Sequence, residues 1–505
     1  MFIRKKANKS GIVSVQIIDK STGGYRMLKT VGSSDNPEEI ISLLHQGRGM
    51  ISELLMQGSF NFDINEERRL VDLFFNGIDE LRLVGPELLL GKLFDEIGFC
   101  QVKDKMFRHL VLARLSFPAS KLKTTDYLFK YTGERIDVDK VYRYLDKLHN
   151  KQKQLVQQIS YVHTLGLLNN QINIVFYDVT TLYFEIEQED ELRRTGFSKD
   201  GKHQNPQIVL GLLVSVDGYP LAYDVFDGNQ FEGHTLMPVI EGFKQRYGLE
   251  DLIVVADAGL LSSDNIENLQ QKQFGYILGA RLKNEKETIK KQVLALTLKN
   301  GQSASLIVDD YCKLIITYSD SRAKKDAANR RRGIEKLERS IKSGKLTKSN
   351  INNRGYNKYL RMEGQLTISM DYDRCKADAA WDGLKGYKTN LDLPKEAIIE
   401  NYGHLWKIEK AFRISKTDLR IRPVYHRLQH RIQAHICIAF CAYKVYKELE
   451  RQLKIKKSDL SPEKAIEIAK TIYRITIVTP FSKTRESRLY TPHQEQLDLL
   501  KLFQI

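Results

Sequence analysis

The order of strand-like and helix-like segments between residues 170 and 282 restricts the fold of this chain more than any other feature. Apolar residues first mark three strands, then a helix, a strand, a second helix and a last strand. In order, the segments are INIVFYDV, PQIVLGLLVSV, YPLAYDVF, TLMPVIEGFKQRYG, DLIVVADAG, SSDNIENLQQ and GYILGAR. The sequence therefore predicts an α/β domain.

The connections between these segments predict how the strands pair. Asp217 and Gly218 form a tight hairpin signal between the second and third strands, so we expect the first three strands to be antiparallel. A helix before the fourth strand implies a crossover to a parallel partner. A mixed sheet flanked by helices in this order is found in ribonuclease H-like folds.

Changes in periodicity and composition divide the rest of the chain. The expected parts are an N-terminal β-hairpin module (1–60), a helical domain whose basic helices could bind DNA (61–168), the first part of an α/β core (169–282), a largely β insertion (283–395), the second part of the core (396–451) and a C-terminal tail for dimerisation (452–505).

Composition limits the classes of protein that the chain can belong to. A net charge of +16 over 505 residues indicates a polyanionic partner such as nucleic acid, although some basic proteins have no such partner. The five cysteines include no CxxC pair, which disfavours a zinc ribbon or a disulfide framework. Without an apolar leader or a run of roughly 18 apolar residues, we expect a cytoplasmic protein with no membrane association.

Two aspartates follow apolar strand segments. Asp178 ends INIVFYD and Asp257 ends LIVVAD. In neighbouring strands such carboxylates converge, and protonation or a cation must relieve their repulsion. Hard oxygen ligands suit Mg²⁺ or Mn²⁺. The alternative for Asp257 is a helix N-cap, but Ser262 stands nearer the start of the next helix.

A third acid, Glu409, lies in YGHLWKIEKAFRISK. On one continuous helix, Tyr402, Glu409 and Lys416 would share a stripe because they are seven residues apart. Arg413 would fall on the same stripe, where the alternative is an ordinary ion pair with Glu409. His435, Cys437 and Cys441 suggest a metal site, but we expect them to pack in the core because no fourth ligand is near.

These segments together resemble the bacterial insertion-sequence DDE transposases that carry a Tyr-x2-Arg-x3-Glu-x6-Lys signature. The motifs are YDVTTLYFE, GFSKDGKHQNPQIVLGLLVSVDGYPL, FDGN, ADAGLLS and the Glu409 segment. Leu405 stands where the family has Arg, and Arg413 or Lys407 is the candidate replacement. The resemblance implies a ribonuclease H-like core interrupted by an insertion.

The resemblance also implies a site and its partners. Asp178, Asp257 and Glu409 would be catalytic and would hold two Mg²⁺ or Mn²⁺ ions, which activate a nucleophile and stabilise the leaving oxygen. The partner would be double-stranded DNA, both the terminal inverted repeats and the target, bound by a homodimer. Predicted DNA-binding residues are Tyr402, Lys416, Arg413, Trp381, Lys324, Lys325, Arg330, Arg331 and Arg332.

Alternatives remain for several of these roles. The basic residues between 324 and 332 could simply form a solvated helix face, and Trp381 could be a packed residue rather than a base-stacking one. For the whole chain, the alternatives are a stand-alone metal-dependent nuclease or resolvase without joining activity, and a non-catalytic DNA-binding derivative. The derivative should have lost an acid, whereas all three are present.

Overall fold

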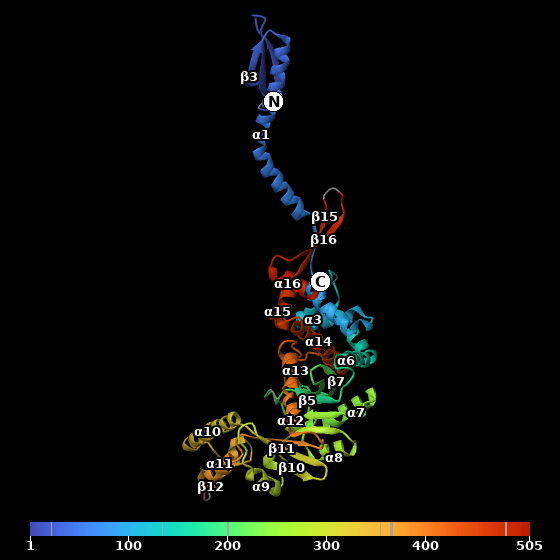
Figure 1. Cartoon of the computed structure of the whole chain (residues 1–505), viewed down its shortest axis with the longest axis vertical. Coiled ribbons are helices and arrows are strands. Elements are labelled where there is room, and N and C mark those ends of the chain that lie inside the picture. Colours follow the sequence, from blue (N-terminus) through green and yellow to red (C-terminus); the bar gives the residue numbers. More distant parts are fainter. Residues whose placement is uncertain (22, 134, 199–200, 354, 364–366, 480–481) are drawn as a thin grey trace. The chain divides into compact units, whose positions relative to one another are not determined.

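The structure is a computed structural model of the chain, and it describes all residues except 22, 134, 199–200, 354, 364–366 and 480–481. The chain forms two compact units. Unit 1 contains Met1–Arg82 and Tyr473–Tyr490, and unit 2 contains Leu83–Ile472 and Thr491–Ile505. Unit 1 thus combines segments from distant parts of the sequence (Figure 1).

Unit 1 consists of two small sheets and a long helix. Its first sheet is antiparallel, in the order β1 (Phe2–Ala7), β2 (Val13–Asp19) and β3 (Arg26–Ser34). Helix α1 (Pro37–Asn76) contacts this sheet and continues past the domain boundary expected at residue 60. The second sheet has the order β16 (Arg485–Tyr490), β15 (Tyr473–Val478) and β4 (Ile78–Leu83).

A group of helices in unit 2 surrounds helix α14 (Gln429–Ile455), which is buried along most of its length. Its neighbours include α2 (Lys92–Ile97), α3 (Lys105–Ser116), α5 (Val138–Lys151), α6 (Lys153–Leu167), α13 (Trp406–Thr417) and α15 (Pro462–Ala469). Helix α4 (Lys121–Thr132) packs on α3 and α5, and α16 (Gln494–Phe503) packs on α15. Cys437 and Cys441 are buried in this core, as expected.

The centre of unit 2 is an eight-stranded mixed sheet. Its order is β10 (Ser303–Asp309), β11 (Cys312–Tyr318), β14 (Leu384–Thr389), β9 (Gly275–Ala280), β8 (Ile253–Ala256), β5 (Ile174–Tyr183), β6 (Gln207–Ser215) and β7 (Pro220–Asp227). Strands β5, β6 and β7 are antiparallel, and β8 is parallel to β5. The predicted pairing of these strands is therefore confirmed.

Both faces of this sheet are covered by helices. Val175 and Tyr177 of β5 pack in a cluster with α7 (Leu236–Tyr247) and α8 (Ser263–Gln271). Phe176, which points to the opposite face, belongs to the larger cluster that contains α12 (Lys395–Gly403) and α13. Side chains alternate along a strand, so Asp178, two residues after Phe176, points to the same face as Phe176.

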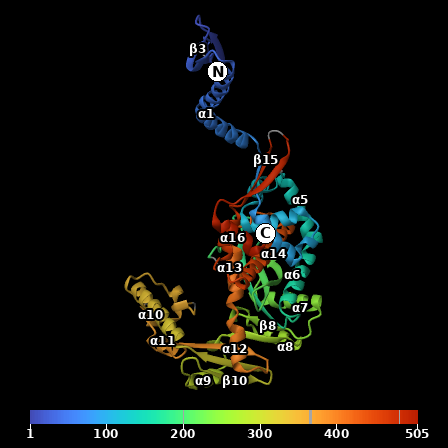
Figure 2. The same ribbon diagram turned by 45° about the horizontal axis from the view of Figure 1, so that its top comes forward.

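The segment predicted as an insertion contributes to the sheet and also forms a separate helical subdomain. Strands β10, β11 and β14 extend the sheet beyond β9, and α9 (Glu287–Ala295) packs against them. Helices α10 (Asp320–Lys342) and α11 (Tyr372–Ala379), with the β12 (Leu360–Glu363) and β13 (Thr367–Met370) pair, have a small apolar cluster of their own. Figure 2 shows α10 and α11 side by side. None of the described helices has the length and apolar character needed to cross a bilayer.

Candidate active site

One row of residues across the sheet contains both strand aspartates. The parallel pairing of β5 with β8 matches Tyr177 with Ala256, so Asp178 and Asp257 come next in register. The pairing of β8 with β9 matches Ala256 with Leu278, which brings Asp257 beside Gly279. Gly279 in turn pairs with Tyr387 of β14. The row is therefore Asp178, Asp257, Gly279 and Tyr387.

The two aspartates face the same side of the sheet as α12 and α13. Phe176 and Val255, two residues before each aspartate, lie in the cluster that these helices complete. Because side chains alternate along a strand, Asp178 and Asp257 point to this same face. Asp178 is partly buried, whereas Asp257 is exposed.

Tyr402, at the end of α12, connects that helix to the row. Its hydroxyl donates a hydrogen bond to Oδ1 of Asp257 at 3.2 Å, and its ring centroid lies 4.6 Å from that of Tyr387. A Cβ on Gly279 would come within 2.4 Å of the Tyr402 hydroxyl oxygen, so glycine makes this approach possible. Burial, and then the charge of Asp257, raise the pKa of Tyr402, which keeps the phenol protonated as a donor.

Lys385, which sequence reasoning missed, lies beside these groups. It comes from β14, and its Nζ lies 4.5 Å from the Tyr402 ring centroid and 5.3 Å from that of Tyr387. Burial lowers the pKa of Lys385, and the nearby Arg322 lowers it further, while Asp257 and Glu409 act in the opposite direction. An ammonium thus lies within the electrostatic range of two of the three predicted catalytic acids. Within the strand segment LKGYKT, no sequence signal distinguishes this lysine.

Glu409 lies in the first turn of α13, the helix that contacts β5 and β6. Its side chain is exposed, and its charge acts on both Tyr402 and Lys385. The helix that the sequence predicted as continuous is interrupted, because α12 ends at Gly403 and α13 begins at Trp406. Consequently Tyr402 is buried toward Asp257 while Glu409 faces solvent, and the two do not share one stripe.

Hydrogen bonds hold the two aspartates at their strand positions. Oδ1 of Asp178 accepts a bond from the Val179 N–H at 2.7 Å, and Oδ1 of Asp257 accepts one from the Ala258 N–H at 2.7 Å. Ser262, rather than Asp257, caps α8, since its Oγ accepts a bond from the Asn265 N–H.

The residues at this site fit a hard divalent cation by their chemistry. The donors are carboxylate oxygens, and two of the three acids are exposed. In the described part of the chain, no three His, Cys, Asp or Glu side chains are grouped closely enough to hold a metal ion. Asp178 and Asp257 are brought into register, whereas Glu409 comes from the helix that packs over them.

The predicted DNA-binding residues fall into three groups. Arg413 and Lys416 lie on α13 after Glu409, with Arg413 exposed and Lys416 partly buried. On α10, four of the predicted residues are exposed, namely Lys324, Lys325, Arg331 and Arg332. Arg330 instead forms a bidentate ion pair with Asp382, and Trp381 packs partly buried against the apolar cluster of β11 and α9.

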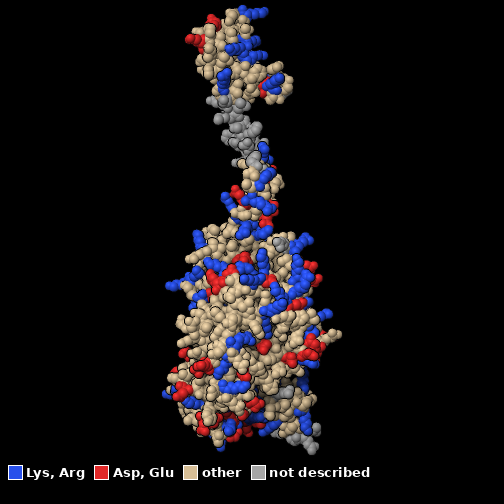
Figure 3. Space-filling model, turned by 90° about the vertical axis from the view of Figure 1, so that its right-hand side faces the viewer, with Lys and Arg blue, Asp and Glu red and all other residues tan. Residues whose placement is uncertain are grey.

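The two candidates to replace the family arginine differ in their surroundings. Nζ of Lys407 donates a hydrogen bond to the Val216 carbonyl oxygen at 2.6 Å and lies 3.8 Å from Asp217. It is therefore held at the β6–β7 hairpin, whereas the exposed Arg413 projects from the same helix as Glu409. Figure 3 shows that Lys and Arg are spread among acidic residues on the face displayed, so charge alone does not locate a DNA path. Lys199 and Asp200, within the GFSKDGKHQ motif, lie outside the described residues.

The model of a family described as "Transposase DDE domain" matches residues 169–444, more than half of the 505 residues. No curated protein matches the chain.

Several solved structures are similar to parts of the chain. A piggyBac transposase synaptic complex with hairpin DNA matches with a TM-score of 0.37 and 10% identity, over 77% of this chain and 79% of the other. A Mos1 transposase paired-end complex with the left transposon end matches with a TM-score of 0.16 and 9% identity, over 34% and 56%. A Mos1 mariner paired-end complex with Mn gives a TM-score of 0.15 and 11% identity, over 31% and 54%.

Proposed function

Because this chain belongs to the DDE transposase family, we propose that it cleaves DNA at transposon ends and joins those ends to target DNA. The observation that carries the proposal is the register that brings Asp178 and Asp257 together on the face covered by the Glu409 helix. We further propose that the domain is ribonuclease H-like and that the chain is of the bacterial insertion-sequence type, with Tyr402, Glu409 and Lys416 as its signature residues.

In the proposed reaction, Asp178, Asp257 and Glu409 would hold two divalent cations, Mg²⁺ or Mn²⁺. The chemistry supplied by such a pair would be activation of the attacking oxygen and stabilisation of the leaving oxygen in an in-line displacement at phosphorus. Tyr402 orients Asp257 through its hydrogen bond, and Lys385 supplies positive charge between Asp257 and Glu409. Exposed Arg413 and neighbouring Lys416 bind the DNA backbone beside the acid.

The same carboxylates serve both steps of transposition. In the first step the nucleophile is water, and in the second it is the 3′-hydroxyl of the released end, so only the nucleophile changes. A DNA-bound homodimer would hold the two ends together. A nuclease without joining activity is the second candidate, and formation of joined products distinguishes the two.

The proposal is tested with a plasmid that carries the sequences flanking the reading frame. Asp178→Asn, Asp257→Asn and Glu409→Gln should each reduce cleavage in Mg²⁺ by at least about a hundredfold while DNA binding is retained, because each removes one anionic ligand. Asp251→Asn, at the exposed opposite end of β8, is the matched control and should cleave normally. Normal cleavage by one of the three variants would remove that acid from the site.

A further inference from the structure

Unit 2 contains a cavity of about 690 Å³ that the catalytic proposal does not use. It lies between the end of α3, the first turn of α4 and residues 420–435. Its lining includes five Lys and Arg residues and two histidines but no Asp or Glu. The basic residues are Arg114, Lys121, Lys123, Arg420 and Arg422. We call it the basic cavity.

Two of these cations are almost completely buried. Arg114 and Lys121 are each 5% exposed, and neither forms an ion pair within the part of the chain that the structure describes. Nη1 of Arg114 reaches only the carbonyl oxygens of Leu419 and Arg420, at 3.4 and 3.5 Å, and its buried Nε has no hydrogen-bond partner. Two adjacent buried cations without a counter-ion are unfavourable, and a bound anion would relieve this.

The desolvation of these groups is large. Burial lowers the pKa of Arg114 to about 10 and lowers that of Lys121 well below its ordinary range, and Arg114 adds to the effect on Lys121. The pKa of each group falls because burial removes water from the charged form and no carboxylate partner compensates for that loss.

The two histidines add no negative charge. The Nε2–H of His435 donates to the Ile421 carbonyl oxygen at 3.0 Å, which leaves Nδ1 as a buried acceptor without a partner. His426 lies beside it, with ring centroids 5.4 Å apart. Burial lowers the pKa of both rings, and Lys121 and Arg114 lower it further.

The start of α4 also favours an anion. This helix has 12 residues, and its first turn lines the cavity. Ser120 Oγ accepts a bond from the Lys123 N–H at 3.3 Å, and the Thr124 N–H bonds the Ser120 carbonyl oxygen. Ser120 thus already caps the Lys123 N–H, and the earlier N–H groups of the first turn, which have no carbonyl partner within the helix, attract negative charge together with the helix dipole.

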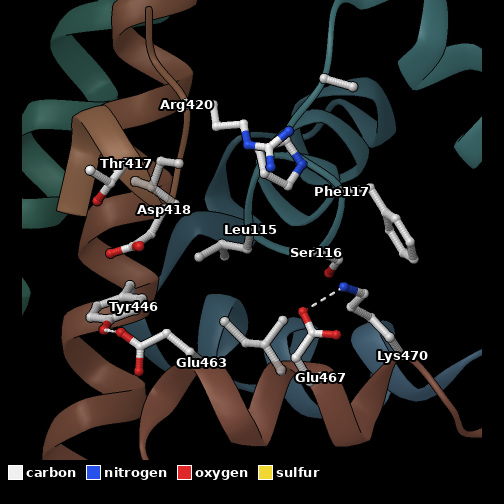
Figure 4. A pocket seen from close by; sticks show the side chains of 14 residues that line it. Leu115, Ser116, Phe117, Thr417, Asp418, Arg420, Tyr446, Glu463, Glu467 and Lys470 are labelled. Atoms are coloured by element: carbon white, nitrogen blue, oxygen red, sulfur yellow. Dashed lines mark hydrogen bonds and ion pairs between the residues drawn. The ribbon is translucent and has the colours of Figure 1, made fainter.

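We propose that the basic cavity binds a phosphate group, held by Arg114, Lys121 and the first turn of α4. A neighbouring cavity of about 480 Å³ provides the contrast, since Asp418, Glu463 and Glu467 line it and Lys470 already pairs with Glu467 at 2.6 Å. Figure 4 shows this acidic cavity, with Arg420 at the side away from the two glutamates. The two cavities share Arg420 but differ in the charge of their lining.

Two sources of phosphate fit the chemistry, namely the backbone of bound DNA and a free phosphate compound. Between Glu409 and the cavity, the chain contains Arg413, Lys416 and Arg420 in succession. Such a series of positive charges suits the successive phosphates of a DNA backbone. The DNA source rests on the proposed function, whereas binding of the free ion does not. The experiment therefore measures the two separately.

The first measurement is the temperature of the unit 2 melting transition in the full chain, with inorganic phosphate or with sodium chloride at matched ionic strength. At a phosphate concentration about ten times its Kd, this temperature should rise by roughly 2 °C, because phosphate binds only the folded state. Lys121→Met and Arg114→Met should each abolish this rise. Lys130→Met, an exposed position on the same helix, should keep it.

Lys121→Met should also melt at a higher temperature than the wild type without phosphate, since it removes a buried charge that lacks a partner. Absence of a phosphate effect in the wild type, or an equal effect in both cavity variants, would overturn the proposal. Two variants are used so that a folding failure in one leaves the other to decide.

The second measurement is the salt dependence of binding to duplex DNA. If the cavity holds a backbone phosphate, Lys121→Met should reduce the slope of log K against log salt by about 0.9. An unchanged slope, together with loss of the phosphate-ion effect, assigns the cavity to a free phosphate compound. Catalysis is measured in neither arm, so failure of the cavity and failure of the transposition proposal are distinguishable.

Discussion

Asp178 has a partly exposed carboxylate in the middle of the buried strand β5 because the neighbouring strand β8 ends before this position. Strand β5 continues to Tyr183 and pairs with β6 along this length, but β8 stops at Ala256. Beyond that point the row opens toward solvent on the α13 face, where Asp257 follows. Partial exposure to solvent thereby reduces the cost of placing an acid after a run of apolar residues.

Gly279 is the residue whose replacement most directly tests the geometry of the row. Gly279→Ala should destabilise the protein by about 1–3 kcal/mol and reduce cleavage, because its Cβ would collide with the Tyr402 hydroxyl that bonds Asp257. Gly242→Ala, in α7 with open space around it, should instead stabilise by about 0.5–1 kcal/mol. Denaturant unfolding and a cleavage assay measure both. Unchanged cleavage by Gly279→Ala would show that Tyr402 does not position Asp257.

His426 should make stability depend on pH. Burial, followed by the charges of Lys121 and Arg114, lowers its pKa from 6.5 to about 3. Between these values the unfolded chain binds the proton and the folded chain does not, so stability falls as the pH falls, by about 1.4 kcal/mol per pH unit from this group. His426→Asn should reduce the slope of the unfolding free energy against pH between pH 4 and 6.5, to which His163 and His435 also contribute, whereas exposed His45→Asn should not. Parallel curves for wild type and His426→Asn would contradict this.

Sequence reasoning located the acids but not the groups that support them. Asp178 and Asp257 could be found because each follows an apolar strand, and the hairpin and crossover predicted that those strands lie side by side. Lys385 and Gly279 acquire their positions from the pairing of β9 with β14, strands separated by the whole predicted insertion. No local pattern records that pairing. The roles of the acids in catalysis remain a proposal.

At the scale of elements, the short break between α12 and α13 gives Tyr402 and Glu409 different surroundings. Hydrogen bonds across it run from each residue to the third one before it, as from the Leu405 N–H to the Tyr402 carbonyl oxygen and from the Ile408 N–H to that of Leu405. This tighter winding turns the following helix relative to the preceding one. Tyr402 is thus directed into the sheet, while Glu409 stays on the open face. A spacing of seven cannot reveal this, because it assumes an unbroken helix.

The exposed face of α13 should bind DNA. Trp406 stands one turn before Glu409 and is 54% exposed, so Trp406→Ala should weaken DNA binding about tenfold through lost base stacking, with little change in stability. Trp381→Ala should mainly lower stability, by about 2 kcal/mol, because Trp381 packs on an apolar cluster. Fluorescence anisotropy with labelled DNA and thermal unfolding separate the two effects. If Trp381→Ala lost DNA binding at unchanged stability, the predicted base-stacking role would belong to Trp381.

The antiparallel strands and the crossover were predictable because turn residues and strand periodicity are local. The return of β14 to the sheet was not, since Asp382-Gly383 before LKGYKT signals a turn but does not indicate which strand the segment pairs with. Similarly, the sequence predicts strands at β10 and β11 but does not predict that β11 pairs with β14. Pairing over such separations depends on tertiary packing rather than on local propensity.

At the scale of the whole molecule, the chain contains two compact units, and one of them is assembled from distant segments. The predicted C-terminal tail is divided, since β15 and β16 belong to unit 1 while α15 and α16 belong to unit 2. Strand β15 lies between β16 and β4, so unit 1 needs residues near both ends of the sequence. Sequence periodicity could indicate the strands but not this partnership.

Two units with separate cores should unfold in two transitions. Ile17→Ala, at a fully buried position of β2, should lower the temperature of one melting transition, because a core truncation typically reduces the free energy of unfolding by roughly 2–5 kcal/mol. Leu145→Ala, fully buried in α5, should lower the other one. Differential scanning calorimetry measures both. Equal displacement of a single transition by both variants would show that the units unfold as one.

The partnership of β4 with β15 also orders events during synthesis. Strand β4 leaves the ribosome early, but β15 and β16 follow only after unit 2 has been made almost completely. At about 5–20 residues per second, this delay is on the order of tens of seconds. During that time β4 has an open edge, and a prematurely terminated polypeptide would keep it open permanently. The N-terminal unit is therefore completed only after translation has passed the eight-stranded sheet of unit 2.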